Sequence, residues 1–189
     1  MKFFLFLVRY RKTVAFTMLF IAIILKIFIF KSTIYSLVYD FWGHLGLFLA
    51  TLGVLLRTWA AGAINKGKTL SCNGPYHLCR NPLYTGSLLI AIGLTLVLNS
   101  IYLWILILIL VLIYIPKVKA EERYLAAIFK DDYQQYKKLT GICYPKKLTI
   151  ERLYCNWSKE QWINNKEFYT LITVIVGGIM FESVNALIR

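Results

Sequence analysis

Long apolar runs alternate with shorter polar stretches along the whole chain. The five runs cover residues 13–30, 41–63, 83–98, 101–115 and 168–187. As helices, they are long enough to cross or nearly cross a hydrocarbon core of ~30 Å. Only Asn99 and Ser100 separate the third run from the fourth, which predicts a tight helical hairpin within the membrane. The pattern therefore predicts an all-α, polytopic integral membrane protein with about five transmembrane helices.

The two ends of the chain fit this membrane topology. No small-residue cleavage site follows the N-terminal MKFFLFLVRYRK, so we expect the first run to be retained as a helix rather than removed as a signal peptide. The last run is a weaker span, because Glu182 interrupts it. Since the sequence contains no internal repeat, residues 1–189 are predicted to form one membrane domain.

Composition supports the membrane class, and charge sets the orientation. Hydrophobic residues make up 59% of the 189 residues, against roughly 45–50% in a typical soluble protein. If the N-terminus is cytoplasmic, all but three of the 22 Lys and Arg residues lie on the cytoplasmic side, the exceptions being Lys26, Lys31 and Arg189. The positive-inside rule favours this orientation and explains the net charge of +13, so membrane lipids are expected partners and nucleic acid is not. The polar stretches 74–86 and 117–167 are then both cytoplasmic.

Cysteine and histidine give no sign of a metal site. The four cysteines all fall on the cytoplasmic side, where a reducing compartment argues against disulfides. Cys72 and Cys79 lack the close pair spacing of a zinc site, and the chain has only two histidines. We therefore expect no metal centre.

The stretch GPYHLCRNPLYTG, residues 74–86, is a polar turn at the start of an apolar run. Its two prolines restrict the backbone, and its two glycines allow a ligand or a helix to approach closely. The polar groups that it offers are Tyr76, Arg80, Asn81 and Tyr84. A plain connecting loop is the simpler interpretation, but the combination indicates a rigid interfacial site for a ligand with an anionic group and a flat ring.

A second polar motif, KVKAEERYLAAIFKDDYQQYKK, continues the fourth run as residues 117–138. Lys117 and Glu121 are four residues apart and share one helix face. A surface helix with salt bridges explains most of its charges. Two adjacent carboxylates at a membrane exit, Glu121 and Glu122, are costly unless a cation or hydrogen-bond donor meets one of them. Together with an arginine-bearing turn on the same side, they suit a ligand with both an ammonium and a carboxylate group, such as the methionine part of S-adenosylmethionine.

At these residues the chain resembles the isoprenylcysteine carboxyl methyltransferases and the related membrane phospholipid methyltransferases, in the form of a bacterial-type member. The family pattern H-x-L-V-x-x-G-P-Y-x-x-x-R-[HN]-P-x-Y-x-G corresponds here to KTLSCNGPYHLCRNPLYTG. After two spans, the pattern E-E-x-x-L-x-x-x-F-G-x-x-Y-x-x-Y corresponds to EERYLAAIFKDDYQQYKK. The resemblance covers about residues 45–147, and the helix predicted at about 168–187 is an addition to that core.

The resemblance implies a methyltransferase that takes S-adenosylmethionine from the cytosol and a lipid, or a lipidated or hydrophobic small molecule, from the bilayer as methyl acceptor. It implies a cytoplasmic, helical cofactor-binding segment and a bacterial inner membrane location. The residues that match cofactor-binding positions are Lys68, Thr69, Leu70, Ser71, Tyr76, Asn81, Pro82, Leu83, Tyr84 and Glu121. Lys117 matches an arginine near the acceptor. Arg80 and Glu122 are the catalytic candidates, with Arg80 orienting the acceptor and Glu122 serving as the base that an amine acceptor would need.

Several departures from the family pattern leave the acceptor open. Asn81 and Lys68 stand where the carboxyl methyltransferases have histidine, and Lys117 replaces an arginine. An ammonium cannot clamp a carboxylate with two parallel hydrogen bonds as a guanidinium does. An isoprenylcysteine carboxylate, a phospholipid amine and another hydrophobic acid, amine or thiol all stay possible. Lys130, where glycine is usual, is expected to change only the end of a helix.

Two other functions fit parts of the pattern. Membrane sterol reductases contain a similar Arg-His-Pro-x-Tyr turn and use NADPH, but they are usually much longer than this chain. A non-catalytic membrane scaffold with the same fold would also tolerate Asn81 and Lys117. The retained Arg80, Tyr84 and Glu121 favour the methyltransferase over the scaffold.

Overall fold

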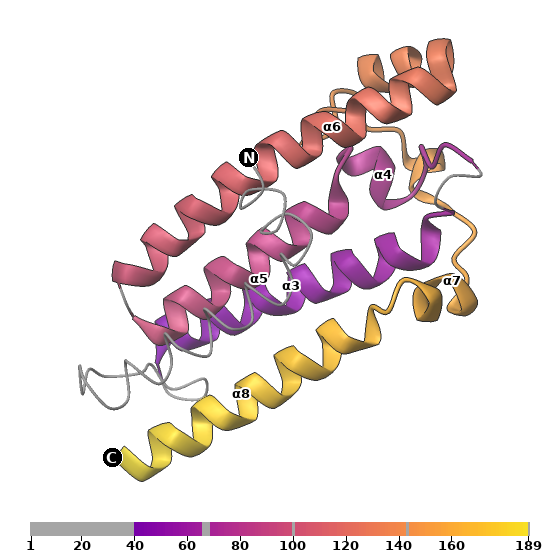
Figure 1. The fold of residues 1–189 in the computed structure, drawn as a ribbon. Coiled ribbons are helices and arrows are strands. Elements are labelled where there is room, and N and C mark those ends of the chain that lie inside the picture. The colour runs from indigo at the N-terminus through magenta and orange to yellow at the C-terminus, as the bar shows by residue number, and fades with distance from the viewer. Residues whose placement is uncertain (1–39, 66–68, 100, 143, 189) are drawn as a thin grey trace.

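The described part of the chain is helical. The structure is a computed structural model that describes residues 40–65, 69–99, 101–142 and 144–188. Its helices are α3 (Phe41–Ala63), α4 (Pro75–Leu78), α5 (Pro82–Leu98), α6 (Ile101–Leu139), the 3-10 helix η2 (Ile150–Leu153), α7 (Lys159–Asn164) and α8 (Phe168–Ile188) (Figure 1). Within those ranges, a single isolated β-bridge joins Thr140 and Pro145. The all-α prediction is confirmed for these residues.

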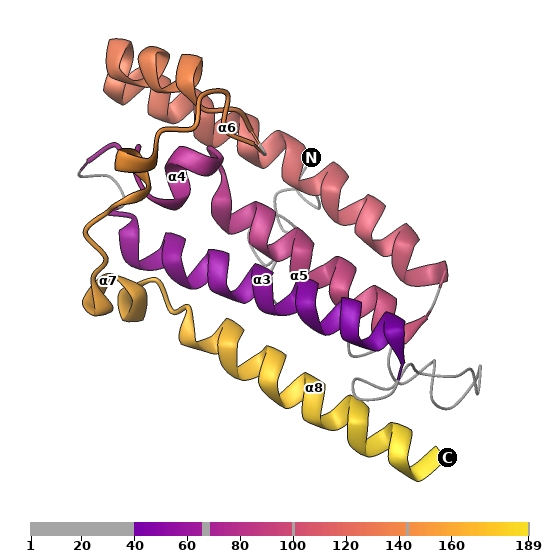
Figure 2. The same ribbon diagram turned by 180° about the vertical axis from the view of Figure 1, so that it is seen from behind.

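Helices α3 and α5 form a close antiparallel pair, seen from behind in Figure 2. Glycines at a spacing of seven make the contact possible. A Cβ atom on Gly46 would lie 2.6 Å from the carbonyl oxygen of Gly93, and one on Gly53 would lie 2.6 Å from that of Gly86. The two backbones therefore meet without intervening side chains, as small residues allow in helix pairs.

Helices α5 and α6 form the predicted hairpin. Asn99 ends α5 in the left-handed conformation, with φ 46° and ψ 52°, and its N–H donates to the Leu96 carbonyl. Asparagine tolerates this conformation better than most residues, which explains the short connection. At the other end of α5, the rings of Tyr84 and Tyr114 pack edge to face, with their centroids 5.0 Å apart, and link the two helices.

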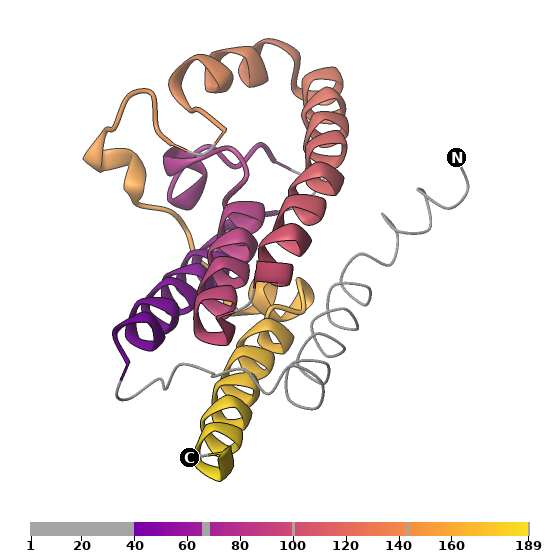
Figure 3. The same ribbon diagram turned by 90° about the vertical axis from the view of Figure 1, so that its left-hand side faces the viewer.

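Helix α6 contains a sharp bend near its C-terminal end. It runs through Pro116 and then breaks at Lys130, where φ is 37° and ψ is −111°. Beyond Lys130 the helix turns across the end of the bundle, over α4 (Figure 3). An L side chain rarely adopts such a φ, whereas glycine does so easily. The bend therefore accounts for the glycine that is usual at this position in the family that the chain resembles.

The segment after residue 150 completes the end of α3. The last four carbonyl groups of α3, residues 60–63, all accept hydrogen bonds. Their donors are, in order, the N–H of Ile64, the side-chain amide of Asn165, the N–H of Ser158 and the hydroxyl of Ser71. The last carbonyls of a helix lack partners in a following helical turn, and here Asn165 and Ser158 of the C-terminal segment bind two of the four.

Two described helices, α3 and α6, are long and apolar enough to cross a membrane, and α5 and the first part of α8 are shorter apolar helices. These four helices coincide with four of the five predicted runs. The first run, 13–30, lies outside the described residues. On α6, large side chains such as Leu108 and Leu112 are more than half exposed, which is typical of a helix that faces lipid.

Candidate functional site

Arg80 joins the polar turn to both arms of the bent helix. Its Nε donates to Glu122 Oε1 at 2.8 Å, and its Nη1 donates to the Thr140 carbonyl at 2.9 Å. Its backbone N–H also donates to the Gly141 carbonyl at 2.9 Å. The Arg80 and Glu122 side chains are only 6% and 17% exposed. The carboxylate before the bend and the backbone after it are therefore fixed by one guanidinium.

Tyr84 and Glu121 form the second link between the two predicted motifs. The Tyr84 hydroxyl donates to Glu121 Oε1 at 2.9 Å, and Lys117 Nζ lies 3.7 Å from the same oxygen. The side chains of Lys117 and Glu121 are 33% and 40% exposed. One carboxylate is thus oriented by a tyrosine and a lysine while it keeps an open side.

A tyrosine cluster lies beneath the turn. Gly74, at φ 62°, and Pro75 start the short helix α4, which buries Tyr76 against Ala60, Tyr133 and Tyr136. The Tyr136 hydroxyl donates to the Tyr76 carbonyl at 2.7 Å. Burial raises the pKa of the Tyr76 phenol, so Tyr76 stays neutral and can donate a hydrogen bond.

Several buried polar atoms at this cluster have no hydrogen-bond partner in the described part of the chain. They are Tyr76 Oη, Asn81 Nδ2, Tyr133 Oη and Thr140 Oγ1. Buried polar groups in native proteins nearly always have a partner, so these atoms are candidate contacts for a polar ligand or for water. A neutral tyrosine, an amide donor and the open carboxylate of Glu121 suit a ligand that carries an ammonium, a carboxylate and a polar ring. These residues therefore fit S-adenosylmethionine.

The other predicted cofactor residues surround this cluster to different degrees. Leu70 and Leu83 pack against the cluster, and Pro82 is buried at the first position of α5. Thr69 is exposed, and the Ser71 hydroxyl caps the α3 carbonyl of Ala63. Lys68 lies outside the described residues. The cofactor assignments and the catalytic assignment of Arg80 and Glu122 stay predictions. Among these residues, Tyr76, Leu70 and Leu83 lie at one cluster, Tyr84 binds Glu121, and Arg80 binds Glu122.

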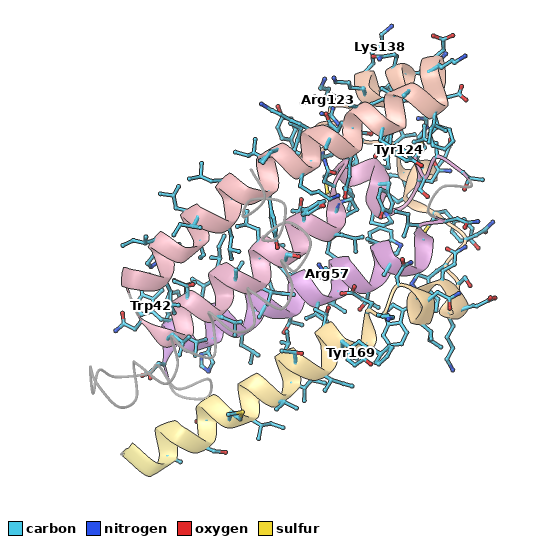
Figure 4. The ribbon with its side chains drawn as sticks, in the orientation of Figure 1. Trp42, Arg57, Arg123, Tyr124, Lys138 and Tyr169 are labelled. Carbon is cyan, nitrogen blue, oxygen red and sulfur yellow. The ribbon has the colours of Figure 1, made fainter. Side chains whose placement is uncertain are left out.

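The site contains residues that the sequence analysis did not single out. Arg57 of α3 and Glu167 form a buried ion pair, and Figure 4 shows Arg57 on the side of α3 that faces the start of α8. Arg57 was detectable, since a cation inside an apolar run is unusual. Tyr133 and Tyr136 could have been found from their places in the Y-x-x-Y motif. Glu167 gave no such signal.

Two further groups near the polar turn, Cys72 and His77, have altered acidity. Burial raises the pKa of the Cys72 thiol to about 11, so it is not a thiolate at neutral pH. Burial, together with the nearby Arg152 charge, lowers the pKa of His77. Neutral His77 accepts a hydrogen bond at Nε2 from the Thr149 N–H at 3.0 Å. The described residues contain no group of three or more His, Cys, Asp and Glu side chains that could hold a metal ion.

The phospholipid methyltransferase family model matches residues 10–132 of the chain. This range includes the polar turn, the hairpin and the paired glutamates.

Two curated bacterial proteins are similar in sequence. The cobalt-zinc-cadmium resistance protein CzcN of Cupriavidus metallidurans is 34% identical over 119 residues, which is 61% of this chain and 53% of that protein. The nickel-cobalt-cadmium resistance protein NccN of Alcaligenes xylosoxydans xylosoxydans is 31% identical over 106 residues, which is 55% of this chain and 48% of that protein. The chain matches about half the length of these relatives. No solved structure gives a significant match.

Proposed function

Because the chain belongs to the phospholipid methyltransferase family, we propose that it is an S-adenosylmethionine-dependent methyltransferase. It acts at the membrane–cytosol interface on a hydrophobic acceptor, either an isoprenylcysteine-like carboxylate or a phospholipid amine. The observation that carries the proposal is the meeting of the two motifs. Tyr84 of the turn binds Glu121 of α6, and Arg80 of the turn binds Glu122.

The proposed roles follow from exposure and charge. Glu121, oriented by Tyr84 and partly exposed, suits the ammonium of the cofactor. Tyr76 and Asn81 have buried donors that find no partner among the described residues, and these donors suit its polar atoms. Arg80 and Glu122 are engaged with each other, so we propose that they hold the turn against α6, in place of the catalytic roles expected from the sequence. Lys117 lies beside Glu121 and is the residue proposed to face the acceptor.

S-adenosylmethionine, when bound, supplies a methyl group already activated on a sulfonium. The remaining tasks of the protein are to align the acceptor with the methyl group and to exclude water. The rigid turn between Pro75 and Pro82 fixes the cofactor side of that alignment. A carboxylate acceptor attacks without losing a proton, and a positive Lys117 would attract it. An amine acceptor must reach the site neutral, because Glu122 is already bound to Arg80.

We further propose that α3, α5, α6, α8 and the first apolar run span a bacterial inner membrane, as one domain of residues 1–189. The N-terminus and the site are then cytoplasmic. Support comes from the apolar lengths of α3 and α6 and from the Lys and Arg residues around the bent end of α6. Arg123 and Lys138, labelled in Figure 4, are exposed there.

The proposal predicts methyl transfer that depends on Glu121. Membranes containing the wild-type chain, Glu121→Ala or the exposed-site control Glu160→Gln are incubated with methyl-labelled S-adenosylmethionine. Products are then separated into lipid, protein and small-molecule fractions. We expect label with the wild type and the control, and a loss of ~100-fold or more with Glu121→Ala, because one misplaced group at a reacting centre has that effect.

The fraction that carries label identifies the acceptor class. Equal labelling by Glu121→Ala and wild type would refute the assigned site. No label and no cofactor binding would favour the scaffold, and NADPH-dependent reduction of a membrane lipid would favour a reductase.

The names of the two relatives suggest a physiological setting for this reaction. We propose that methyl transfer by this chain contributes to resistance to divalent cobalt, cadmium or a similar metal. The same variants test it in a host that lacks the gene, because growth on these metals should be restored by wild type and not by Glu121→Ala. Restoration by both would separate resistance from methyl transfer.

A further inference from the structure

A buried ion pair connects the segment after residue 150 to α3. Arg57 Nε donates to Glu167 Oε1 at 2.6 Å, and its Nη2 donates to Oε2 at 2.8 Å. The two side chains are 10% and 3% exposed. This parallel, two-bond geometry fixes the orientation of the guanidinium as well as its position.

The same guanidinium also holds the first turn of α5. Arg57 Nη1 donates to the Leu83 carbonyl at 2.9 Å and to Ser87 Oγ at 2.5 Å. Leu83 belongs to the stretch 81–84, which lies between the tyrosine cluster and Glu121. Arg57 thus fixes the backbone of this stretch at Leu83, while the neighbouring Tyr84 binds Glu121. Any movement of Arg57 would be transmitted directly to this stretch.

We propose that Arg57 is a positioning residue of the cofactor site, that Glu167 orients it, and that the C-terminal segment is therefore a working part of that site. The inference rests on the proposed function and extends it to a region that the family match does not cover. Arg57 touches neither cofactor nor acceptor in this arrangement. It acts through its hydrogen bonds to the Leu83 carbonyl and to Ser87, which hold the backbone of the stretch 81–84 in position.

The physical reason is the cost of an unpaired buried charge. Without the Glu167 carboxylate, the Arg57 cation would stay in a buried position with only neutral acceptors, an arrangement that proteins avoid. The side chain would turn toward water and release Leu83. The C-terminal segment itself would stay attached, because Ser158, Asn165 and Trp157 bind α3 independently of Glu167.

Glu167→Gln tests this inference, with Glu160→Gln as the matched control on the same segment. Glutamate 160 is exposed, so its substitution removes the same charge without a buried partner. The binding of S-adenosylmethionine to the purified full chain in detergent is measured by titration calorimetry. We expect the dissociation constant to rise ~10-fold or more in Glu167→Gln, because a small displacement of the stretch 81–84 would misplace the groups that bind the cofactor. In the control the dissociation constant should stay unchanged.

Arg57→Lys provides a second variant that keeps the buried charge. A lysine can pair with Glu167 but cannot bind the Leu83 carbonyl and Ser87 at the same time. We expect thermal stability close to wild type, a similar loss of cofactor affinity and a raised KM for cofactor with little change in the KM for acceptor. Without cofactor, amide hydrogen exchange in residues 84–87 should be faster in both variants than in wild type. If Arg57 only stabilised the contact between α3 and the C-terminal segment, exchange in residues 84–87 would not change.

The outcomes separate this inference from the proposed function. Wild-type affinity and exchange in both Arg57→Lys and Glu167→Gln would overturn the positioning role and leave the methyltransferase intact. A wild-type chain that binds no S-adenosylmethionine would overturn the proposed function and, with it, the role of Arg57 in a cofactor site.

Discussion

At the scale of single residues, one guanidinium or one hydroxyl fixes each part of the site. Arg80 binds Glu122 and the Thr140 carbonyl, so it connects positions that are 42 and 60 residues away. Tyr84 orients Glu121 with a single hydrogen bond. These contacts are buried or half-buried, where hydrogen bonds to charged groups contribute more than they do in open water.

His77 makes the fold sensitive to acid. The imidazole is buried, its pKa is lowered mainly by burial, and it must be neutral at Nε2 to accept from Thr149. As pH falls below the ordinary value of about 6.5, the unfolded chain takes up a proton before the folded one does. We therefore predict that stability is fully present above that pH and declines below it.

Thermal unfolding in detergent, followed by tryptophan fluorescence between about pH 5 and about pH 8, measures this decline. His77→Gln keeps an acceptor and does not titrate, so its melting temperature should depend less on pH over that range. An equal slope in the variant and the wild type would show that other groups cause the acid sensitivity.

At the scale of elements, two backbone features determine how the helices meet. The glycine contacts between α3 and α5 bring two backbones together, so the second half of α3 and the start of α5 are held side by side. The bend at Lys130 brings Tyr133, Tyr136 and Thr140 back over α4. Without that bend, α6 would continue past the polar turn, and Arg80 could not reach Thr140.

Lys130→Gly is predicted to stabilise the protein. Lys130 is exposed, and its φ of 37° is strained for any residue with a Cβ atom. Relief of that strain should exceed the extra entropy of glycine in the unfolded chain, with a net gain of ~1 kcal/mol. Gln134→Gly, at an exposed position in the regular helix beyond the bend, should instead cost ~1 kcal/mol.

Thermal or denaturant unfolding of the two variants in the same detergent compares them directly. If Lys130→Gly lowered stability as much as Gln134→Gly, the strain at the bend would be disproved.

At the scale of the whole molecule, the C-terminal segment covers the end of the bundle that carries the two motifs. Its backbone and side chains bind the last turns of α3 and the start of α4, and Glu167 pairs with Arg57 of α3. Figures 1 and 2 show α8 starting beside the end of α3 and running back along it. The family match ends at residue 132, so this enclosure is built by a part of the chain that the match does not include.

Gly62 and Trp157 test that enclosure. A Cβ atom on Gly62 would overlap the indole ring of Trp157, whose Nε1 donates to the Thr58 carbonyl at 3.1 Å. We predict that Gly62→Ala costs ~1–3 kcal/mol, because the overlap forces the ring away. In a Trp157→Ala background the same substitution should cost almost nothing.

The coupling free energy from this double-mutant cycle is the measurement. If the changes in unfolding free energy of the two substitutions were additive, the cost of Gly62→Ala would not come from the Trp157 ring.

The sequence by itself determined the helices, because hydrophobic runs, prolines at helix starts and Asn99 between two runs are local signals. It also determined the two motifs and the family, since their residues follow one another at fixed spacing. The resemblance already predicted that the polar turn and the paired glutamates share a site, but only the tertiary structure decided how they contact each other and which further residues join them. The Arg80 contacts depend on the bend at Lys130, and the pairing of Arg57 with Glu167 spans 110 residues. Such contacts follow from how helices pack in space, and no spacing along the chain encodes them.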